Sequence, residues 1–418
     1  MTDVTGRATF RQVLAVPVFR VLFLCRALAI GADTLRTVAL SFLVFDRTGS
    51  AFLGALTFGI SFLPQVFGGV VIGALPDLVR PRPLIASGYL IEAVGAAVLA
   101  LAGLPVWACL LLVASIGCLS PVFNGTAGRL TADTLSGDAY VLGRSLFQLI
   151  ASAAQLIGLA AGGLAVATVG AQHALLITAA CHLVAALGTR LGMADLPAPH
   201  REGDRSLLGR SRRVNAQLLA DRTVLRLLFV LWLPPAFVTG AESLLVPYSA
   251  VRGFPDGAAG LLLACVPVGM IPGNLVVARL LSPATRERAV PVLVALLGLP
   301  LLAFALDLDM VALGALLVVT GFGFGYGIGV QRQFRDAVPA GVRGQAFGLA
   351  STGLMTLQGV GPTVFGLVGE VVPVGVAMAA GGVATVLTAC WIALSGRPGP
   401  KGDRESENAG SHSAANPR

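Results

Sequence analysis

Long apolar segments alternate with short polar loops along nearly the whole chain. Segments long enough to cross about 30 Å of hydrocarbon lie near residues 18–45, 51–75, 83–102, 105–127, 142–168, 172–193, 224–249, 257–281, 289–306, 310–331, 344–369 and 373–395. Few charged residues interrupt them, and each has the length of a membrane-spanning helix. The pattern predicts an all-α membrane protein with twelve transmembrane helices.

The longest polar stretch separates these segments into two sets of six. It is rich in Arg, Pro and Ser, which is typical of a solvated linker. The expected organisation is a cytoplasmic N-terminal segment at 1–17, a first six-helix bundle at 18–193, a cytoplasmic linker at 194–223, a second six-helix bundle at 224–395, and a disordered cytoplasmic tail at 396–418.

Composition agrees with a membrane protein. Apolar residues make up 56% of the chain and charged residues 12%, and mean hydropathy is +0.83; a soluble domain carries about 25% charged residues. The six cysteines are scattered through apolar segments without CxxC spacing, so we interpret them as buried apolar residues and predict no metal site.

The basic residues are distributed very unevenly between the two sides of the predicted membrane. With a cytoplasmic N-terminus, 25 of the 29 Lys and Arg residues face the cytoplasm, two face outside and two lie in the first span. The positive-inside rule therefore predicts cytoplasmic N- and C-termini in a plasma membrane, by inference a bacterial one. Because the arginines do not gather on one soluble face, the net charge of +8 does not indicate nucleic-acid binding.

The two sets of six spans contain a repeated sequence. Gly31-Ala32-Asp33-Thr34-Leu35 is matched 209 residues later by Gly240-Ala241-Glu242-Ser243-Leu244. A carboxylate at the centre of a bilayer costs roughly 2.5–3.5 kcal/mol on insertion scales, so each acid needs a partner or a function. Related halves with polar groups at corresponding positions are typical of secondary transporters.

Asp33 lies near the middle of the first span between two arginines. Arg26 precedes it by seven residues and Arg36 follows it by three, and both spacings return to about the same helical face. Two interpretations stay open. The group is either an ion pair that fixes helix packing, or a carboxylate that binds a proton or a substrate cation.

Three further ionisable residues inside predicted spans are candidates for function. Glu242 has no basic neighbour within its own span, so apolar surroundings disfavour its charged form and suit a group that loads and unloads protons. Glu92 either takes part in coupling directly or pairs with Arg26 or Arg36 across helices. His182 is a secondary candidate for a proton relay.

The end of the second span and the loop after it contain Gly73, Asp77, Arg80 and Arg82. An acid at a helix end followed by arginines suits a cytoplasmic latch, in which Asp77 pairs with an arginine or caps a neighbouring helix in one conformation. The alternative is a basic loop that only sets topology.

Motifs of membrane enzymes and of ATP-driven pumps are absent from the sequence. It contains no GxxxxGK[ST], no HExxH and no GxSxG, and its only lysine is Lys401. We therefore predict that the protein is not an enzyme, has no catalytic residues and needs no cofactor.

These features together resemble the major facilitator superfamily. The superfamily's loop signature, G-x-x-x-D-R/K-x-G-R-R/K, is matched at Gly73, Asp77 and Arg82, whereas Leu78 and Arg80 depart from it. The resemblance implies two pseudo-symmetric six-helix bundles, with helices one, four, seven and ten lining a central cavity.

The details resemble the drug:proton antiporter branch of that superfamily. Gly31-Ala32-Asp33 and Asp46-Arg47-Thr48-Gly49-Ser50 look like the start of macrolide-efflux and siderophore exporters. The antiporter pattern G-P-x-x-G-G is matched at Gly158, Gly162 and Gly163, although Leu159 replaces the proline. By this resemblance Asp33 and Glu242 face the cavity.

The prediction is a monomeric, proton-coupled efflux transporter that binds protons and a small hydrophobic or drug-like substrate within the lipid bilayer. Its expected coupling residues are Asp33, Glu242, Arg26, Arg36 and Glu92. One alternative is a proton symporter or facilitator that takes up a small metabolite. Another is a membrane sensor or scaffold that transports nothing.

Overall fold

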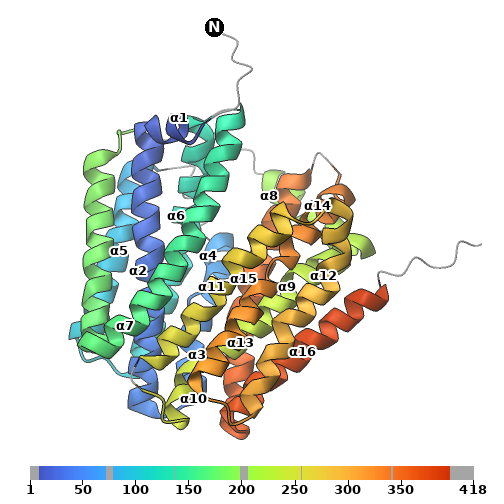
Figure 1. Ribbon diagram of the computed structural model, residues 1–418. Helices are drawn as coiled ribbons and strands as arrows, with labels where there is room; N and C mark the ends of the chain where they lie inside the picture. The colour runs from blue at the N-terminus through green and yellow to red at the C-terminus, as the bar shows by residue number, and fades with distance from the viewer. Residues whose placement is uncertain are drawn as a thin grey trace, which may run out of the picture.

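The computed structural model describes residues 9–71, 79–135, 137–197, 206–255, 257–339 and 342–395, and within these ranges every regular element is a helix (Figure 1). The first half contains α1 (Phe10–Ala15), α2 (Pro17–Thr48), α3 (Ala51–Gly59), α4 (Leu63–Val71), α5 (Pro81–Leu101), α6 (Val106–Thr134) and α7 (Gly137–Gly192). The second half contains α8 (Ser206–Ala220), α9 (Arg222–Glu242), α10 (Leu245–Val251), α11 (Ala258–Arg279), α12 (Pro283–Gly298), the 3₁₀ helix η2 (Leu299–Ala305), α13 (Met310–Gly323), α14 (Tyr326–Ala337), α15 (Arg343–Val371) and α16 (Val374–Ser395).

The helices account for the predicted twelve crossings. Among the described residues, ten helical segments are long and apolar enough to span a membrane. The longest of them, Leu149–Gly192, reverses direction at Gly170, where φ is 83°, and so makes two crossings. Gly adopts this left-handed region readily because it has no Cβ. The 29-residue helix α15 supplies the remaining crossing, and the all-α, twelve-helix prediction is confirmed.

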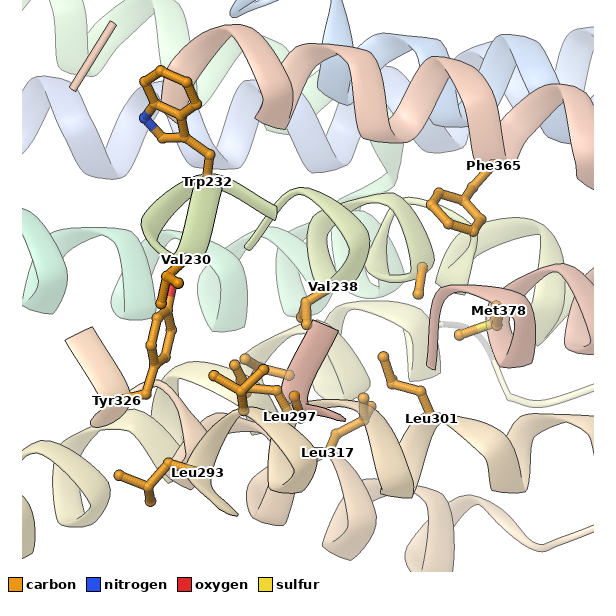
Figure 2. Packing of buried hydrophobic residues seen from close by; sticks show 14 of the residues in the cluster. Val230, Trp232, Val238, Leu293, Leu297, Leu301, Leu317, Tyr326, Phe365 and Met378 are labelled. Carbon is orange, nitrogen blue, oxygen red and sulfur yellow. The ribbon is translucent and has the colours of Figure 1, made fainter. Parts of the chain in front are cut away.

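The largest cluster of buried hydrophobic side chains lies mainly in the second half (Figure 2). It brings together side chains from α9, α12, α13 and α16, among them Val230, Leu297 and Leu317. The polar atoms of two aromatic side chains inside it donate hydrogen bonds to backbone carbonyl oxygens. Trp232 Nε1 donates to Ala350 O at 2.7 Å, and the Tyr326 hydroxyl donates to Leu231 O at 3.2 Å.

The two halves make close contacts with each other at one end of the molecule. This end, where Thr48, Gly170, Gly257 and Val371 lie, is called the closed end here. Toward the opposite end, where the N-terminus lies, the two sets of helices diverge (Figure 1). Most of the joining contacts form two seams, one between α7 and α11 and one between α3 and α15.

Each seam includes a point at which glycine backbone meets glycine backbone. A Cβ added to Gly163 in α7 would lie 2.3 Å from the Cα of Gly260 in α11. A Cβ added to Gly59 in α3 would lie 2.5 Å from the carbonyl oxygen of Gly359 in α15. Small residues let helices approach this closely inside a membrane. The close approach at these two points therefore depends on the absence of a Cβ.

Candidate functional site

A cluster of four ionisable side chains lies inside the first half. Asp33 and Arg36 are one turn apart on α2, Glu92 comes from α5, and His182 comes from the part of α7 after Gly170. These four residues are called the charge cluster below. The helices that supply them pack against one another, since both α2 and α5 contact α7.

Arg36 contacts both carboxylates of the cluster. Its Nη2 lies 3.0 Å from Asp33 Oδ1, and its Nη1 forms an ion pair and hydrogen bond with Glu92 Oε2. The guanidinium can do this because its planar fork presents several donors in fixed directions. Arg36 therefore links α2 to α5 and leaves neither acid without a positive neighbour.

His182 lies on the other side of Asp33. Its Nε2 is 3.4 Å from Asp33 Oδ1, and its ring stacks on Tyr89 with centroids 6.4 Å apart and planes 30° apart. Within the described residues, neither ring nitrogen of His182 nor Asp33 Oδ1 has a well-formed hydrogen bond. Asp33 Oδ1 thus lies between a cation and an imidazole that is poised to donate or to accept a proton.

Burial separates Asp33 from the other members of the cluster. The side chains of Arg36, Glu92 and His182 are 7%, 8% and 1% exposed, whereas that of Asp33 is 41% exposed. The Arg36–Glu92 pair is therefore shielded from solvent. Breaking such a buried pair leaves an uncompensated charge, at a cost of about 3–5 kcal/mol. Asp33 is the member whose side chain is substantially exposed, although its Oδ1, which faces Arg36 and His182, is itself buried.

The donor atoms of the cluster also have the spacing of a metal site. Ligand atoms of Asp33, Glu92 and His182 lie within 4.8 Å of one another. However, the Arg36 guanidinium already contacts both carboxylates, and its positive charge disfavours a metal cation at the same point. The arrangement suits a proton better than a metal ion.

Glu242 has quite different surroundings. It is the last residue of α9 and is partly buried. In the part of the chain that the structure describes, no ion pair or hydrogen bond to its carboxyl group is formed. The repeated five-residue sequence therefore places one acid in a charged network and the other outside any such network.

The remaining predicted residues lie in several places. No ion pair to Arg26 is seen in the described ranges; Arg36 is the arginine that meets Glu92. Gly73 and Asp77 of the predicted latch lie outside the described residues. Arg82 donates from Nε to the carbonyl oxygen of Arg190, at 2.8 Å, so it binds the last turn of α7 in the same half.

The three glycines of the antiporter-like pattern face two different partners. A Cβ on Gly158 would meet Gly31 O at 2.6 Å, and one on Gly162 would meet Val38 at 3.2 Å, both in α2. Gly163 instead meets Gly260 of the other half. These glycines therefore let α7 pack closely against α2 in its own half and against α11 across the seam.

Glu370, at the end of α15, makes a polar contact across the other seam. Its Oε1 accepts hydrogen bonds from the Ser50 hydroxyl at 2.5 Å and from the Phe52 N–H at 2.8 Å. Ser50 is the N-cap of α3, so the carboxylate of one half lies at a helix N-terminus of the other half, where negative charge is favoured. Sequence reasoning missed this contact, because an acid at a helix end carries no signal of its distant partner.

Comparisons with known proteins address the fold and the family. The sequence model of the Major Facilitator Superfamily matches residues 22–330. The crystal structure of a mutant of the nucleoside transporter NupG is similar, with a TM-score of 0.72 and 15% identity, over 91% of this chain and 100% of that chain.

A second similar structure is a bacterial homologue of the human lysosomal transporter Spinster, described as inward-facing and unoccupied. Its TM-score is 0.67 with 15% identity, over 90% of this chain and 94% of that chain. No curated protein matches the sequence. At these identities the solved structures show the fold alone.

Proposed function

Because the chain belongs to the major facilitator superfamily, whose members are transporters and not in general enzymes, we propose that it is a proton-coupled exporter of a small hydrophobic or drug-like compound. It works by alternating access, as a monomer in a bacterial plasma membrane with both termini in the cytoplasm. Asp33 and Glu242 carry the coupling. The observation that supports this most strongly is the charge cluster, in which one of the two acidic side chains is substantially exposed.

The formal charges of the cluster favour uptake of one proton. Arg36 balances one of the two carboxylates that it contacts, and with His182 neutral the four side chains carry one net negative charge. A single proton brings the sum to zero. Because burying a neutral group costs less than burying a charged one, protonation favours conformations in which Asp33 is sealed from water.

The separation of the halves supports alternating access. The seams close one end, while the helices diverge toward the other. With the N-terminus in the cytoplasm, as the basic residues predict, the closed end faces outside and the conformation is inward-facing. The Spinster homologue with a similar fold is described by the same term. Transport then requires the two glycine seams to part.

The function is tested with purified protein in liposomes under an imposed pH gradient. Ethidium, a permanent organic cation, is the probe for export, and uridine is the probe for the alternative of metabolite uptake, since NupG is a nucleoside transporter. Antiport drives ethidium into vesicles with an acidic interior. Symport drives uridine into vesicles with an alkaline interior, and neither result depends on protein orientation.

Substitution of the coupling acids gives the sharper result. We expect Asp33→Asn and Glu242→Gln each to abolish gradient-driven accumulation while the protein still inserts into the membrane. The control is Asp46→Asn, which removes an exposed carboxylate near the end of the same helix as Asp33. Full proton-driven export by either coupling variant contradicts the assignment, and flux of neither probe under either gradient supports a sensor or scaffold.

A further inference from the structure

We propose that Asp33 and His182 bind the coupling proton jointly, and that Glu92 serves as the permanent partner of Arg36. This inference rests on the proposed proton coupling and adds a residue to it. His182 becomes half of the proton site. Glu92, one of the acids first considered for coupling, becomes a positioning residue that holds Arg36 in place.

The contact between Asp33 and His182 is suited to sharing one proton. Nε2 and Oδ1 are 3.4 Å apart, Oδ1 also forms the ion pair with Arg36 Nη2 at 3.0 Å, and neither Nε2 nor Oδ1 has a well-formed hydrogen bond among the described residues. A charged imidazole ring donates to the carboxylate, and a neutral ring accepts from a protonated carboxyl group. One hydrogen bond therefore holds the pair together whichever residue carries the proton.

The groups around the pair come from α2 and α5. On α2, Arg36 contacts Asp33 and Arg26 lies two turns earlier; on α5, Glu92 binds Arg36 and Tyr89 stacks on the His182 ring. Glu92 pairs with Arg36, so the positive charge of Arg36 is shared between the two carboxylates and does not act on Asp33 alone.

The two acids also differ in how much of the side chain is exposed. Asp33 is 41% exposed, whereas Glu92 is 8% exposed and paired. His182 is 1% exposed and lies behind Asp33, so a proton reaches the ring through the carboxylate. In the proposed site the proton therefore binds Asp33 first and His182 second.

The test follows the pH dependence of the conformational equilibrium without any substrate. Spin labels are placed at Trp107→Cys and Val311→Cys, exposed positions at the closed end in opposite halves, after the six native cysteines are replaced by alanine. The distance between labels is measured in lipid nanodiscs from about pH 5 to about pH 9, the range in which His titrates.

We expect His182→Gln to move the midpoint of the transition to lower pH by about one unit or more, because the proton then has only Asp33, beside Arg36. Asp33→Asn abolishes the transition, and the double variant behaves like Asp33→Asn, since the two residues act as one site. The matched control is His173→Gln, an exposed histidine on the same helix, which leaves the midpoint unchanged.

Different outcomes identify different errors. A wild-type midpoint in His182→Gln, with the transition abolished in Asp33→Asn, overturns this inference and leaves the proposed function intact. A wild-type transition in Asp33→Asn overturns both. Calorimetric binding of Zn²⁺ that is lost in Asp33→Asn, Glu92→Gln and His182→Gln alike would instead establish a metal site and overturn the proton site.

A second measurement applies if His182→Gln fails to fold. In ¹⁵N-histidine-labelled wild-type protein, the ring signals of His182 are identified as those that persist in His173→Gln and respond to Asp33→Asn. We expect them to change across the same pH range as the distance transition. Ring signals that stay constant throughout that range overturn the inference.

Discussion

Replacing Gly163 by alanine should push the closed end open. The added Cβ would lie 2.3 Å from the Cα and 2.8 Å from the carbonyl carbon of Gly260, where ordinary contact begins at about 3.4 Å. Both obstructing atoms belong to the backbone, so no side chain can rotate away. Helices α7 and α11 must therefore separate by about 1 Å to accept the methyl group.

The size of the effect follows from the cost of overpacking. Forcing an extra methyl group into a tight contact costs about 1–3 kcal/mol. Alanine also favours helix by up to about 1 kcal/mol over glycine, but that gain is present in both conformations and cancels. Because the seam exists only when this end is closed, the open population should rise about 5- to 150-fold, at tenfold per about 1.4 kcal/mol.

The assay is the distance between spin labels at Trp107→Cys and Val311→Cys, read as the fraction of molecules with the longer separation. Gly348→Ala in α15 is the control, since a Cβ there meets nothing within 4 Å. If Gly163→Ala and Gly348→Ala give the same distribution, the seam does not set the equilibrium. Loss of thermal stability without a change in distance would mean that the seam persists in both conformations.

Two further predictions concern the polar contacts. Glu370→Gln weakens the hydrogen bonds to Ser50 and Phe52 by about 1 kcal/mol, as is usual for exposed charge-assisted bonds. The same spin labels should therefore show an open fraction about fivefold larger. The control is Asp309→Asn, at an N-cap within one half, and an unchanged open fraction in Glu370→Gln would contradict the prediction. Glu92→Gln leaves Arg36 underpaired and should destabilise the protein by up to about 3–5 kcal/mol, seen as a lower unfolding temperature; an unchanged temperature would show that Asp33 alone satisfies Arg36.

Much of the fold could be predicted from the sequence, because hydrophobic length is a local property. The segment expected at 83–102 is Pro81–Leu101, and that expected at 373–395 is Val374–Ser395. The short-range pair of Asp33 and Arg36 is equally local, since helical spacing alone brings residues three apart together. The polar stretch at 194–223 was expected only as a linker, and it contains the helix α8.

The cluster could be predicted only in part, because its partners come from different helices. Whether Glu92 meets Arg26 or Arg36 depends on how α5 is rotated against α2, and a single sequence does not contain that angle. His182 shares its predicted span, 172–193, with His173, and the sequence does not record which of the two faces Asp33. The bond from Glu370 to Ser50 joins residues 320 positions apart, which no local pattern records.

The glycine seams have a consequence for how sharply this end moves. Dispersion between two backbones falls steeply with distance, and a gap of about 0.5–1 Å already forfeits a quarter to a half of the attraction. No long side chain bridges Gly163 and Gly260, so the attraction at this contact falls off quickly once α7 and α11 begin to part, whereas the hydrogen bonds of Glu370 to Ser50 and Phe52 hold the other seam. We therefore expect the α7–α11 seam to open abruptly, while the contact of Glu370 resists opening at the other seam.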